Sequence, residues 1–237
     1  MGVSGQRTFA VAVTTCRRPE GVSYLGQALR SIRDAGFEVW TVVVDGPELV
    51  PRPAPNDLAA AVEPCDFQMG PKLCFKRALS SLLEEAVQWL IVFQDDVQVA
   101  RGLRGWLEGP DNLPDDGVCS LYCSETLGAN DAGYDAWWRL NLTPTDERPQ
   151  PWYGSLGACA LMLRPAVAEM FLEEDPQMGR TDRIGAALGE FCYKQGIPFW
   201  VHSPSLVEHV GEVSVNGKMP MTPERTAGRF CSDVSQL

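Results

Sequence analysis

The stretch WLIVFQDD, residues 89–96, sets the expected fold, because five consecutive apolar residues run directly into a polar residue and two acids. A short, continuous apolar run is typical of a strand that is buried on both faces, as in a parallel sheet. Open parallel sheets bind ligands at the carboxyl ends of their strands. The sequence therefore predicts an α/β protein with Asp95 and Asp96 at a ligand-binding edge.

The segments before this stretch predict further strands of the same sheet. FAVAVTT (9–15) and VWTVVVD (39–45) are further apolar strands, and residues 25–32 between them are apolar at helical spacing. Such a strand–helix–strand unit implies parallel strands with a right-handed crossover. A short strand is expected near residues 65–67. Gly70-Pro71 then begins a long helix, whose expected apolar face consists of Leu79, Leu82, Leu83, Ala86 and Leu90.

The segments after residue 100 are less regular. We predict strands at 117–123 and 153–163 and a last strand within FWVHSPSLVEHVG (199–211). Helices are expected at 165–174 and 182–195, and residues 128–150 form a long loop. From Val213 onward the tail is polar and rich in glycine and proline, which favours mobility when no ligand is bound.

Composition excludes several classes of protein. Of the 237 residues, 45% are hydrophobic and 22% charged, which is ordinary for one globular domain. Lys and Arg total 20 against 31 acids, so the net charge of −11 disfavours broad nucleic-acid or membrane binding. The eight cysteines lack Cys-x-x-Cys spacing, and the apolar stretch near the N-terminus is too short to span a membrane. We therefore expect free thiols, a cytoplasmic location and no membrane partner.

The acid pair suggests a metal site. Two adjacent carboxylates repel each other unless a cation or hydrogen-bond donors compensate them. Mg²⁺ and Mn²⁺ take oxygen ligands and commonly link carboxylates to phosphates. His209, beside glycine after a strand, is a candidate further ligand, whereas His202 is expected in the core. A strand-end turn with solvated acids is the alternative.

Basic residues follow two of the expected strands. Lys72, Lys76 and Arg77 stand in the first turns of a helix, where cations oppose the helix dipole unless a phosphate lies nearby. Arg17 and Arg18 follow the first strand. Each residue alone is explained by surface charge, but together with the acids they predict a diphosphate–metal site.

Other catalytic patterns are missing or ambiguous. The chain has no Walker-type phosphate loop, no G-x-G-x-x-G and no G-x-S-x-G, so ATPase, dehydrogenase and serine-hydrolase functions lack their key feature. Asp182 begins an expected helix and is either its cap or a general base. Trp137, Trp138, Trp152 and Tyr153 suit sugar rings or bases, or else build the core.

Taken in order, the motifs VAVTTCRRP, VVVDGPE, WLIVFQDDV, YGSLGACALML, TDRIGAALGEF and VEHVGEVSVNG resemble the nucleotide-sugar-dependent glycosyltransferases of the GT-A fold. The acid pair matches their Asp-x-Asp type signature, although Gln94 stands where an acid is usual. The closing His-Val-Gly segment is similar to the N-acetylglucosaminyltransferase IV group. Because no membrane anchor is evident, the resemblance favours a bacterial or viral relative.

This resemblance implies one Rossmann-like GT-A domain over residues 1–237, with a central, mostly parallel sheet flanked by helices. Residues 1–100 would bind the nucleotide sugar, and residues 101–237, with their mobile tail, the acceptor. The implied activity is metal-dependent, inverting transfer of a sugar from a nucleoside diphosphate sugar, with a UDP-sugar favoured, to an acceptor hydroxyl. The implied cofactor is Mn²⁺ or Mg²⁺.

The resemblance also implies roles for individual residues. Asp182 would be the catalytic base, and Asp96 and His209 the metal ligands. The nucleotide sugar would be bound by Thr14, Thr15, Arg17, Asp45, Lys72, Lys76 and Asp95. The acceptor would contact Trp137, Trp138, Trp152, Tyr153, Gly154 and Ser155, with 154–157 as the wall of its site.

Three alternatives stay open. In the first, the enzyme is still a glycosyltransferase but its acceptor is a hydroxylated base in viral DNA. Arg101, Arg104 and Arg139 would then form a local basic track for the DNA. A nucleotidyltransferase also uses a metal and paired acids, but its usual glycine-rich basic loop is replaced here by TCRRPEG (15–21), with one glycine. A protein that binds nucleotide sugars without catalysis is the third.

Overall fold

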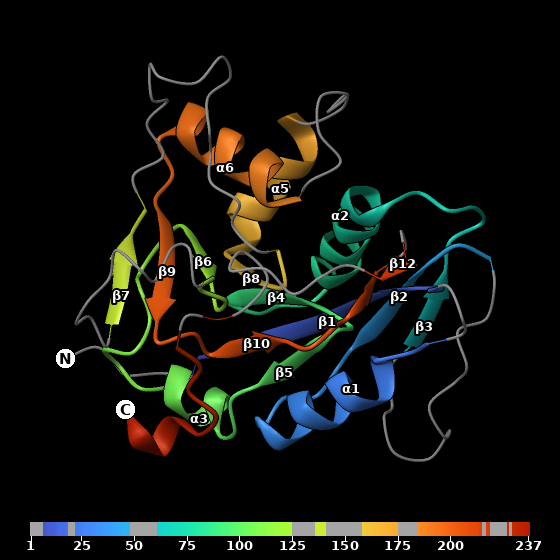
Figure 1. Ribbon diagram of the computed structural model, residues 1–237. Helices are drawn as coiled ribbons and strands as arrows, with labels where there is room; N and C mark the ends of the chain where they lie inside the picture. Colours follow the sequence, from blue (N-terminus) through green and yellow to red (C-terminus); the bar gives the residue numbers. More distant parts are fainter. Residues whose placement is uncertain are drawn as a thin grey trace, which may run out of the picture.

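A central eight-stranded sheet organises the chain, with strand order β3-β2-β1-β4-β8-β6-β9-β7 (Figure 1). The computed structural model describes residues 7–18, 22–47, 61–124, 136–140, 158–174, 184–214, 217–218, 227 and 229–237. The strands are β1 (Phe9–Cys16), β2 (Thr41–Asp45), β3 (Ala61–Pro64), β4 (Trp89–Gln94), β6 (Val118–Ser120), β7 (Ala136–Arg139), β8 (Ala160–Leu163) and β9 (Phe199–Ser203). The predicted α/β class with a mostly parallel sheet is confirmed.

The parallel half of the sheet brings three strand ends together. β1 pairs in parallel with β2 and with β4, and the register places Thr14 beside Gln94 and Cys16 beside Asp45. The three strands predicted from apolar runs are those that form this half. Its carboxyl edge is therefore assembled from residues around 14–18, 45 and 94–96.

The other half of the sheet is mixed. β8 runs antiparallel to both β4 and β6, β6 runs parallel to β9, and β7 runs antiparallel to β9. Because β8 reverses direction between two strands of the same sense, β9 ends at the same edge as β4. The sheet is thus mostly, but not wholly, parallel.

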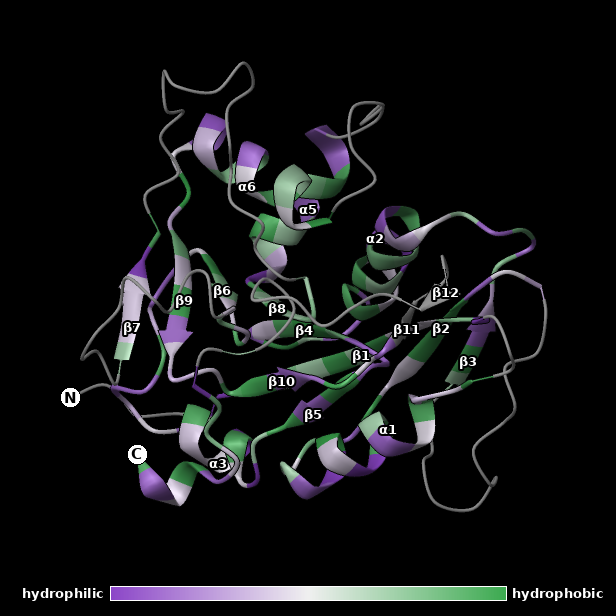
Figure 2. Cartoon of the chain, viewed as in Figure 1, coloured by the Kyte–Doolittle hydropathy of each residue, from purple (hydrophilic) through white to green (hydrophobic). Residues whose placement is uncertain are grey.

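Two helical layers cover the sheet, as Figure 1 shows. On one face lie α1 (Leu25–Asp34) and α3 (Leu103–Leu107); on the other lie α2 (Pro71–Leu82), α5 (Pro165–Glu174) and α6 (Ile184–Gln195). Alternation along β1 explains both layers, since Val11 and Val13 pack toward α1 whereas Ala10 and Ala12 pack toward α2. Figure 2 shows the resulting apolar strands between helices whose outer faces are polar.

Several predicted boundaries were wrong. The strand expected near 65–67 lies at β3, and α2 ends at Leu82 instead of extending to Leu90, because Trp89 and Leu90 enter the sheet. The strand expected at 117–123 is shortened to β6. The expected loop 128–150 contains β7, whose two tryptophans pack on opposite faces of the sheet edge.

The predicted last strand is two strands. β9 ends at a cis Ser203-Pro204 bond, after which β10 (Val207–His209) pairs antiparallel with β5 (Val97–Val99). Two short strands follow, β11 (Val213–Ser214) and β12 (Gly217–Lys218), and the chain closes with the 3-10 helix η2 (Val234–Gln236). Near this end, bridges join Ser205 to Phe230 and Arg101 to Asp233. Over the described ranges, no helix has the length and apolar character needed to cross a membrane.

Candidate functional site

The acid pair lies in the tight turn between β4 and β5, at the carboxyl edge of the sheet. Asp95 is 2% exposed and Asp96 7% exposed, so neither is a solvated turn residue. Buried carboxylates require compensating donors or cations, because desolvation of an isolated charge is very costly. The contacts of these two acids therefore define the site.

Arg18 compensates Asp95. Its Nη1 and Nη2 donate to the two oxygens of the Asp95 carboxylate at 2.5 and 2.6 Å, and the Thr15 hydroxyl donates to Oδ2 at 2.5 Å. Nη2 also donates to Asp96 Oδ2 at 3.1 Å, so one guanidinium holds both acids. The fork geometry of arginine suits this bidentate contact, which a lysine cannot reproduce.

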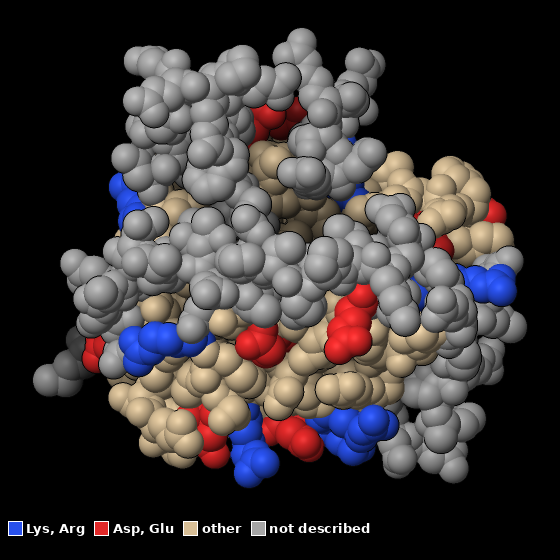
Figure 3. Space-filling model, in the orientation of Figure 1, with Lys and Arg blue, Asp and Glu red and all other residues tan. Residues whose placement is uncertain are grey.

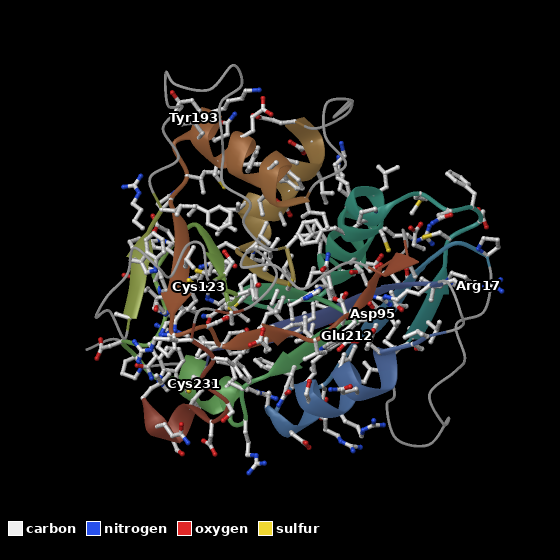
Figure 4. All side chains as sticks on the ribbon, in the orientation of Figure 1. Arg17, Asp95, Cys123, Tyr193, Glu212 and Cys231 are labelled. Atoms are coloured by element: carbon white, nitrogen blue, oxygen red, sulfur yellow. The ribbon has the colours of Figure 1, made fainter. Side chains whose placement is uncertain are left out.

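The arginine singled out from the sequence for nucleotide binding was the neighbouring one. Arg17 is exposed and lies at the outer edge of the molecule, away from Asp95 (Figure 4), whereas Arg18 is 5% exposed. After β1, consecutive side chains diverge, and only one of the two arginines faces the acids. Nothing in the pattern CRRP indicates which of the two arginines faces the acids, and the resemblance pointed to Arg17.

His209 reaches Asp96 from the far end of the chain. Pairing of β10 with β5 sets His209 opposite Val97, and its Nε2 lies 3.2 Å from Asp96 Oδ2. The Val210 amide donates to the Asp96 carbonyl at 2.9 Å. A Cβ on Gly211 would lie 2.7 Å from Asp96 Oδ2, so the glycine of His-Val-Gly allows the backbone to pack on the acid. The structure thus brings together the two residues predicted as metal ligands.

Tyr24, which sequence reasoning missed, connects these parts. The Arg18 guanidinium lies over the Tyr24 ring at 5.1 Å, and the Tyr24 hydroxyl accepts the Glu212 amide at 3.1 Å. The ring therefore contacts the arginine that holds the acids, while its hydroxyl holds the segment that follows His209. No sequence signal marked Tyr24, because a tyrosine just before a helix is unremarkable by itself.

The electrostatics of the acids follow from these contacts. Burial raises the pKa of Asp95, and the Arg18 hydrogen bonds offset this only in part. Burial would also raise the pKa of Asp96, but His209 and Arg18 outweigh it and the pKa is lowered. Asp96 is therefore the more readily ionised member of the pair. Cys16 lies close by, where burial and then the charge of Asp95 raise its pKa to about 12.

The donor set fits one divalent cation. Asp96 Oδ1 and His209 Nδ1 are buried without a hydrogen-bond partner in the described structure, and the contacting atoms Asp96 Oδ2 and His209 Nε2 are 3.2 Å apart. Asp96 Oδ2 already accepts from Arg18 and contacts His209, so the atoms left to bind an ion are the two without a partner, an oxygen and a nitrogen of the kinds that divalent cations take. Within the described ranges, no group of three His, Cys, Asp or Glu residues forms a complete protein cage. Phosphate and water ligands would have to complete the coordination, as is usual for Mg²⁺.

The other residues predicted to bind the nucleotide sugar lie around the same carboxyl edge of the sheet, and each makes a different kind of contact. The Asp45 carboxylate accepts the amides of Met69 and Gly70 at 2.6 and 3.1 Å, which anchors the start of α2. Lys72 is buried in the first turn of α2, whereas the Lys76 ammonium lies 5.8 Å from the Phe171 ring of α5. The Thr14 hydroxyl donates to the Phe93 carbonyl at 3.4 Å.

The predicted catalytic base and most of the predicted acceptor-binding residues fall outside the described part of the chain. Asp182, Trp152, Tyr153, Gly154 and Ser155 lie outside the described residues. The structure does not bring Trp137 and Trp138 into one site, because they pack on opposite faces of β7. His202 is buried, as predicted, with Nδ1 2.7 Å from the Pro204 carbonyl oxygen. The eight cysteines all lie in the described ranges and form no disulfide, also as predicted.

Comparison with known proteins shows the fold alone. The chain has a Rossmann-like α/β fold with a central, mostly parallel sheet of eight strands. A solved structure described as a glucose-1-phosphate thymidylyltransferase from Bacillus anthracis, in complex with sucrose, matches at TM-score 0.53 and 9% identity, over 85% of this chain and 89% of that one. A CMP:2-keto-3-deoxy-manno-octonic acid synthetase complexed with CTP matches at TM-score 0.46 and 15% identity, over 81% and 88%. No protein-family model and no curated protein sequence matches the chain.

Proposed function

We propose that this chain is a glycosyltransferase that moves a sugar from a nucleoside diphosphate sugar, with UDP as the favoured nucleotide, to an acceptor hydroxyl. The observation that carries the proposal is the buried cluster of Arg18, Asp95, Asp96 and His209 at the carboxyl end of β4. This is the edge at which open α/β sheets bind ligands. The fold likeness to an enzyme named for sugar nucleotide chemistry supports the proposal without specifying the reaction.

The formal charge of the cluster suits a metal–diphosphate ligand. The two carboxylates and the Arg18 guanidinium carry formal charges that sum to −1. A net charge of −1 attracts one divalent cation. It also repels a diphosphate less than two uncompensated carboxylates would. Mn²⁺ or Mg²⁺ held by Asp96 and His209 would supply positive charge to the diphosphate leaving group. Asp95, held by Arg18 and Thr15, would orient the turn that carries Asp96.

The other proposed roles follow from position. Thr14 and Thr15 lie near the end of β1, and Asp45 is the last residue of β2, so a nucleoside would lie beside them. Lys72 in the first turn of α2 would face its phosphates. In the transfer step, the acceptor oxygen forms a bond to the anomeric carbon while the bond from that carbon to the phosphate oxygen breaks. The acceptor proton goes to the Asp182 carboxylate, and the nucleoside diphosphate leaves. This direct displacement inverts the anomeric configuration.

A panel of nucleoside diphosphate sugars, with Mn²⁺ and mixed saccharide acceptors, tests the proposal. We expect release of the free nucleoside diphosphate together with a glycosylated product of inverted configuration. Asp96→Asn should abolish it, whereas Asp34→Asn, an exposed acid at the end of α1, should not. A product with retained configuration would remove Asp182 from its proposed role. Full activity of Asp96→Asn would remove Asp96 from the site.

A nucleotidyltransferase is the second candidate, favoured by the fold likeness over 85% of the chain. Its reaction would join a nucleoside triphosphate to a sugar phosphate and release pyrophosphate. The same preparation, supplied with nucleoside triphosphates and sugar 1-phosphates, separates the two functions. Pyrophosphate release, without turnover of any nucleoside diphosphate sugar, would assign this second function.

A DNA-modifying acceptor has weaker support. Arg104 pairs with Glu108 at 3.0 Å, so at least one of the three arginines of the suggested basic track is already neutralised. Figure 3 shows acidic and basic side chains interspersed over the described part of the face in view, and this part has no broad basic area. A saccharide acceptor is therefore the form of the proposal that we favour.

A further inference from the structure

A cavity lies beside β7, the strand at one side edge of the sheet, on the face covered by α3. Its volume is about 490 Å³, within the range of small-molecule sites. Four strand spacings separate β7 from β4, which is roughly 15–20 Å, so this cavity is distinct from the acid pair. Its described lining consists of Trp106, Asp111, Asn112, Leu113, Pro114, Asp115, Asp116, Ala136, Trp137, Trp200 and His202.

Three tryptophans from three separate elements converge on this cavity. Trp106 comes from α3, Trp137 from β7 and Trp200 from β9, and all three are only half-buried. Between the first two, the His202 imidazole packs edge-to-face, with both ring centroids 5.1 Å from its own. Large aromatic side chains are normally either buried in a core or placed at a binding surface. Here part of each indole surface faces a cavity.

The indole N–H groups offer little to a ligand. Trp137 Nε1 donates to the Asn112 carbonyl at 3.0 Å, and Trp200 Nε1 donates to the Asp116 carbonyl at 3.1 Å. The Asn112 side-chain amide donates to the Trp106 carbonyl at 2.9 Å. Two of the indoles therefore line the cavity with their strongest donors already used.

The charge of the lining has one sign. Asp111, Asp115 and Asp116 are exposed, and in the described structure their carboxylates form neither an ion pair nor a hydrogen bond. The described lining contains no lysine or arginine. The nearby arginines bind backbone instead, since Arg7 donates to the carbonyls of Leu107, Gly109 and Pro110, and Arg164 to those of Gln88 and Asp115. These contacts hold the loop in place, and Arg164 also interacts with the charges of Asp115 and Asp116, so the acids of the loop are compensated only in part.

We propose that this cavity binds a small organic cation, namely an ammonium group seated against the tryptophan faces and balanced by the aspartates. Indole faces attract cations through the ring quadrupole, and carboxylates add Coulombic attraction. An anion would be repelled by three acids. A neutral sugar would also pack on indole rings and donate its hydroxyls to carboxylates, but it would gain no Coulombic attraction from the three acids. The proposal goes beyond the transferase function and does not depend on it.

Choline and its neutral isostere 3,3-dimethylbutan-1-ol form the decisive probe pair, because they differ in charge and hardly in shape. In isothermal titration calorimetry of the full chain at constant ionic strength, choline should bind at least tenfold more tightly than the alcohol. A short peptide that carries trimethyl-lysine is a further arm: tighter binding of the peptide assigns a protein-borne cation, and tighter binding of choline assigns a free metabolite. Equal binding of choline and the alcohol, or no binding of either cationic probe, would overturn the proposal.

A matched pair of charge variants tests the aspartates. The triple variant Asp111→Asn, Asp115→Asn, Asp116→Asn changes exposed side chains that form no hydrogen bond or ion pair in the described structure, so it should fold normally and lose choline affinity about tenfold. The control Asp34→Asn, Glu169→Gln, Glu173→Gln removes three exposed acids from α1 and α5 and changes the net charge equally. Its choline affinity should stay within twofold of wild type. An equal loss in both variants would show only a general charge effect and would contradict the site.

Discussion

Replacing Arg18 with methionine tests the structural logic of the acid pair. The substitution keeps much of the side-chain length but removes the contacts of 2.5 and 2.6 Å to Asp95 and of 3.1 Å to Asp96. Two adjacent carboxylates, 2% and 7% exposed, would then be buried beside each other without that cation. Removing one partner of a buried ion pair costs about 3–5 kcal/mol. For a chain of this size, that corresponds to a fall in Tm of roughly 6–20 °C.

Urea unfolding at several pH values measures the effect and its cause. Without the guanidinium, the pKa values of both carboxyls should rise. A buried acid with a raised pKa becomes less destabilising as pH falls, so the difference in unfolding free energy between wild type and Arg18→Met should shrink from pH 7 to pH 5. The double variant Arg18→Met, Asp95→Asn should recover about 2–3 kcal/mol of the loss. A loss below about 1 kcal/mol for Arg18→Met, or a difference that does not change with pH, would refute the reasoning.

Three further predictions address the surroundings of the pair. Gly211→Ala places a Cβ 2.7 Å from Asp96 Oδ2, so urea unfolding should show a loss of about 1–3 kcal/mol in unfolding free energy. Gly105→Ala is the control, because its Cβ would meet no atom within 4 Å. Equal losses in the two variants would contradict the close approach of Gly211 to Asp96. Because burial and Asp95 raise the pKa of Cys16 to about 12, its alkylation by iodoacetamide at pH 8, followed by mass spectrometry, should be about 10³-fold slower than that of an unperturbed cysteine. The rate should keep rising up to pH 10, and a plateau near pH 9 would show an ordinary thiol. Asp182→Asn should lower kcat about 10²–10⁴-fold with little change in donor affinity, whereas an equal loss of both would assign the residue to structure.

The sequence predicted the parallel core because its strands are continuous apolar runs. FAVAVTT, VWTVVVD and WLIVFQDD each became a central strand, since burial on both faces leaves few other places for such segments. Strands at the mixed end were harder to locate. β7 has only four residues, AWWR, at a sheet edge, and short edge strands carry little periodic signal.

The site was predictable in its chemistry but not in its contacts. An acid pair after a buried strand, and a histidine beside glycine near the end of the chain, were visible as residue types. The choice of Arg18 over Arg17, and the part of Tyr24, depend on where side chains point after β1 ends, which residue spacing does not encode. Likewise, Trp137 and Trp138 seemed equivalent until β7 placed them on opposite faces.

The central claim is that Asp96 and His209 hold a divalent cation through which the diphosphate of the donor is bound. Isothermal titration calorimetry of UDP into the full chain, with and without Mn²⁺, tests this most directly. We expect UDP to bind at least tenfold more tightly with Mn²⁺, and this gain to disappear in both Asp96→Asn and His209→Gln but to persist in Asp34→Asn. UDP affinity that is independent of Mn²⁺, or an undiminished Mn²⁺ effect in Asp96→Asn, would contradict the account.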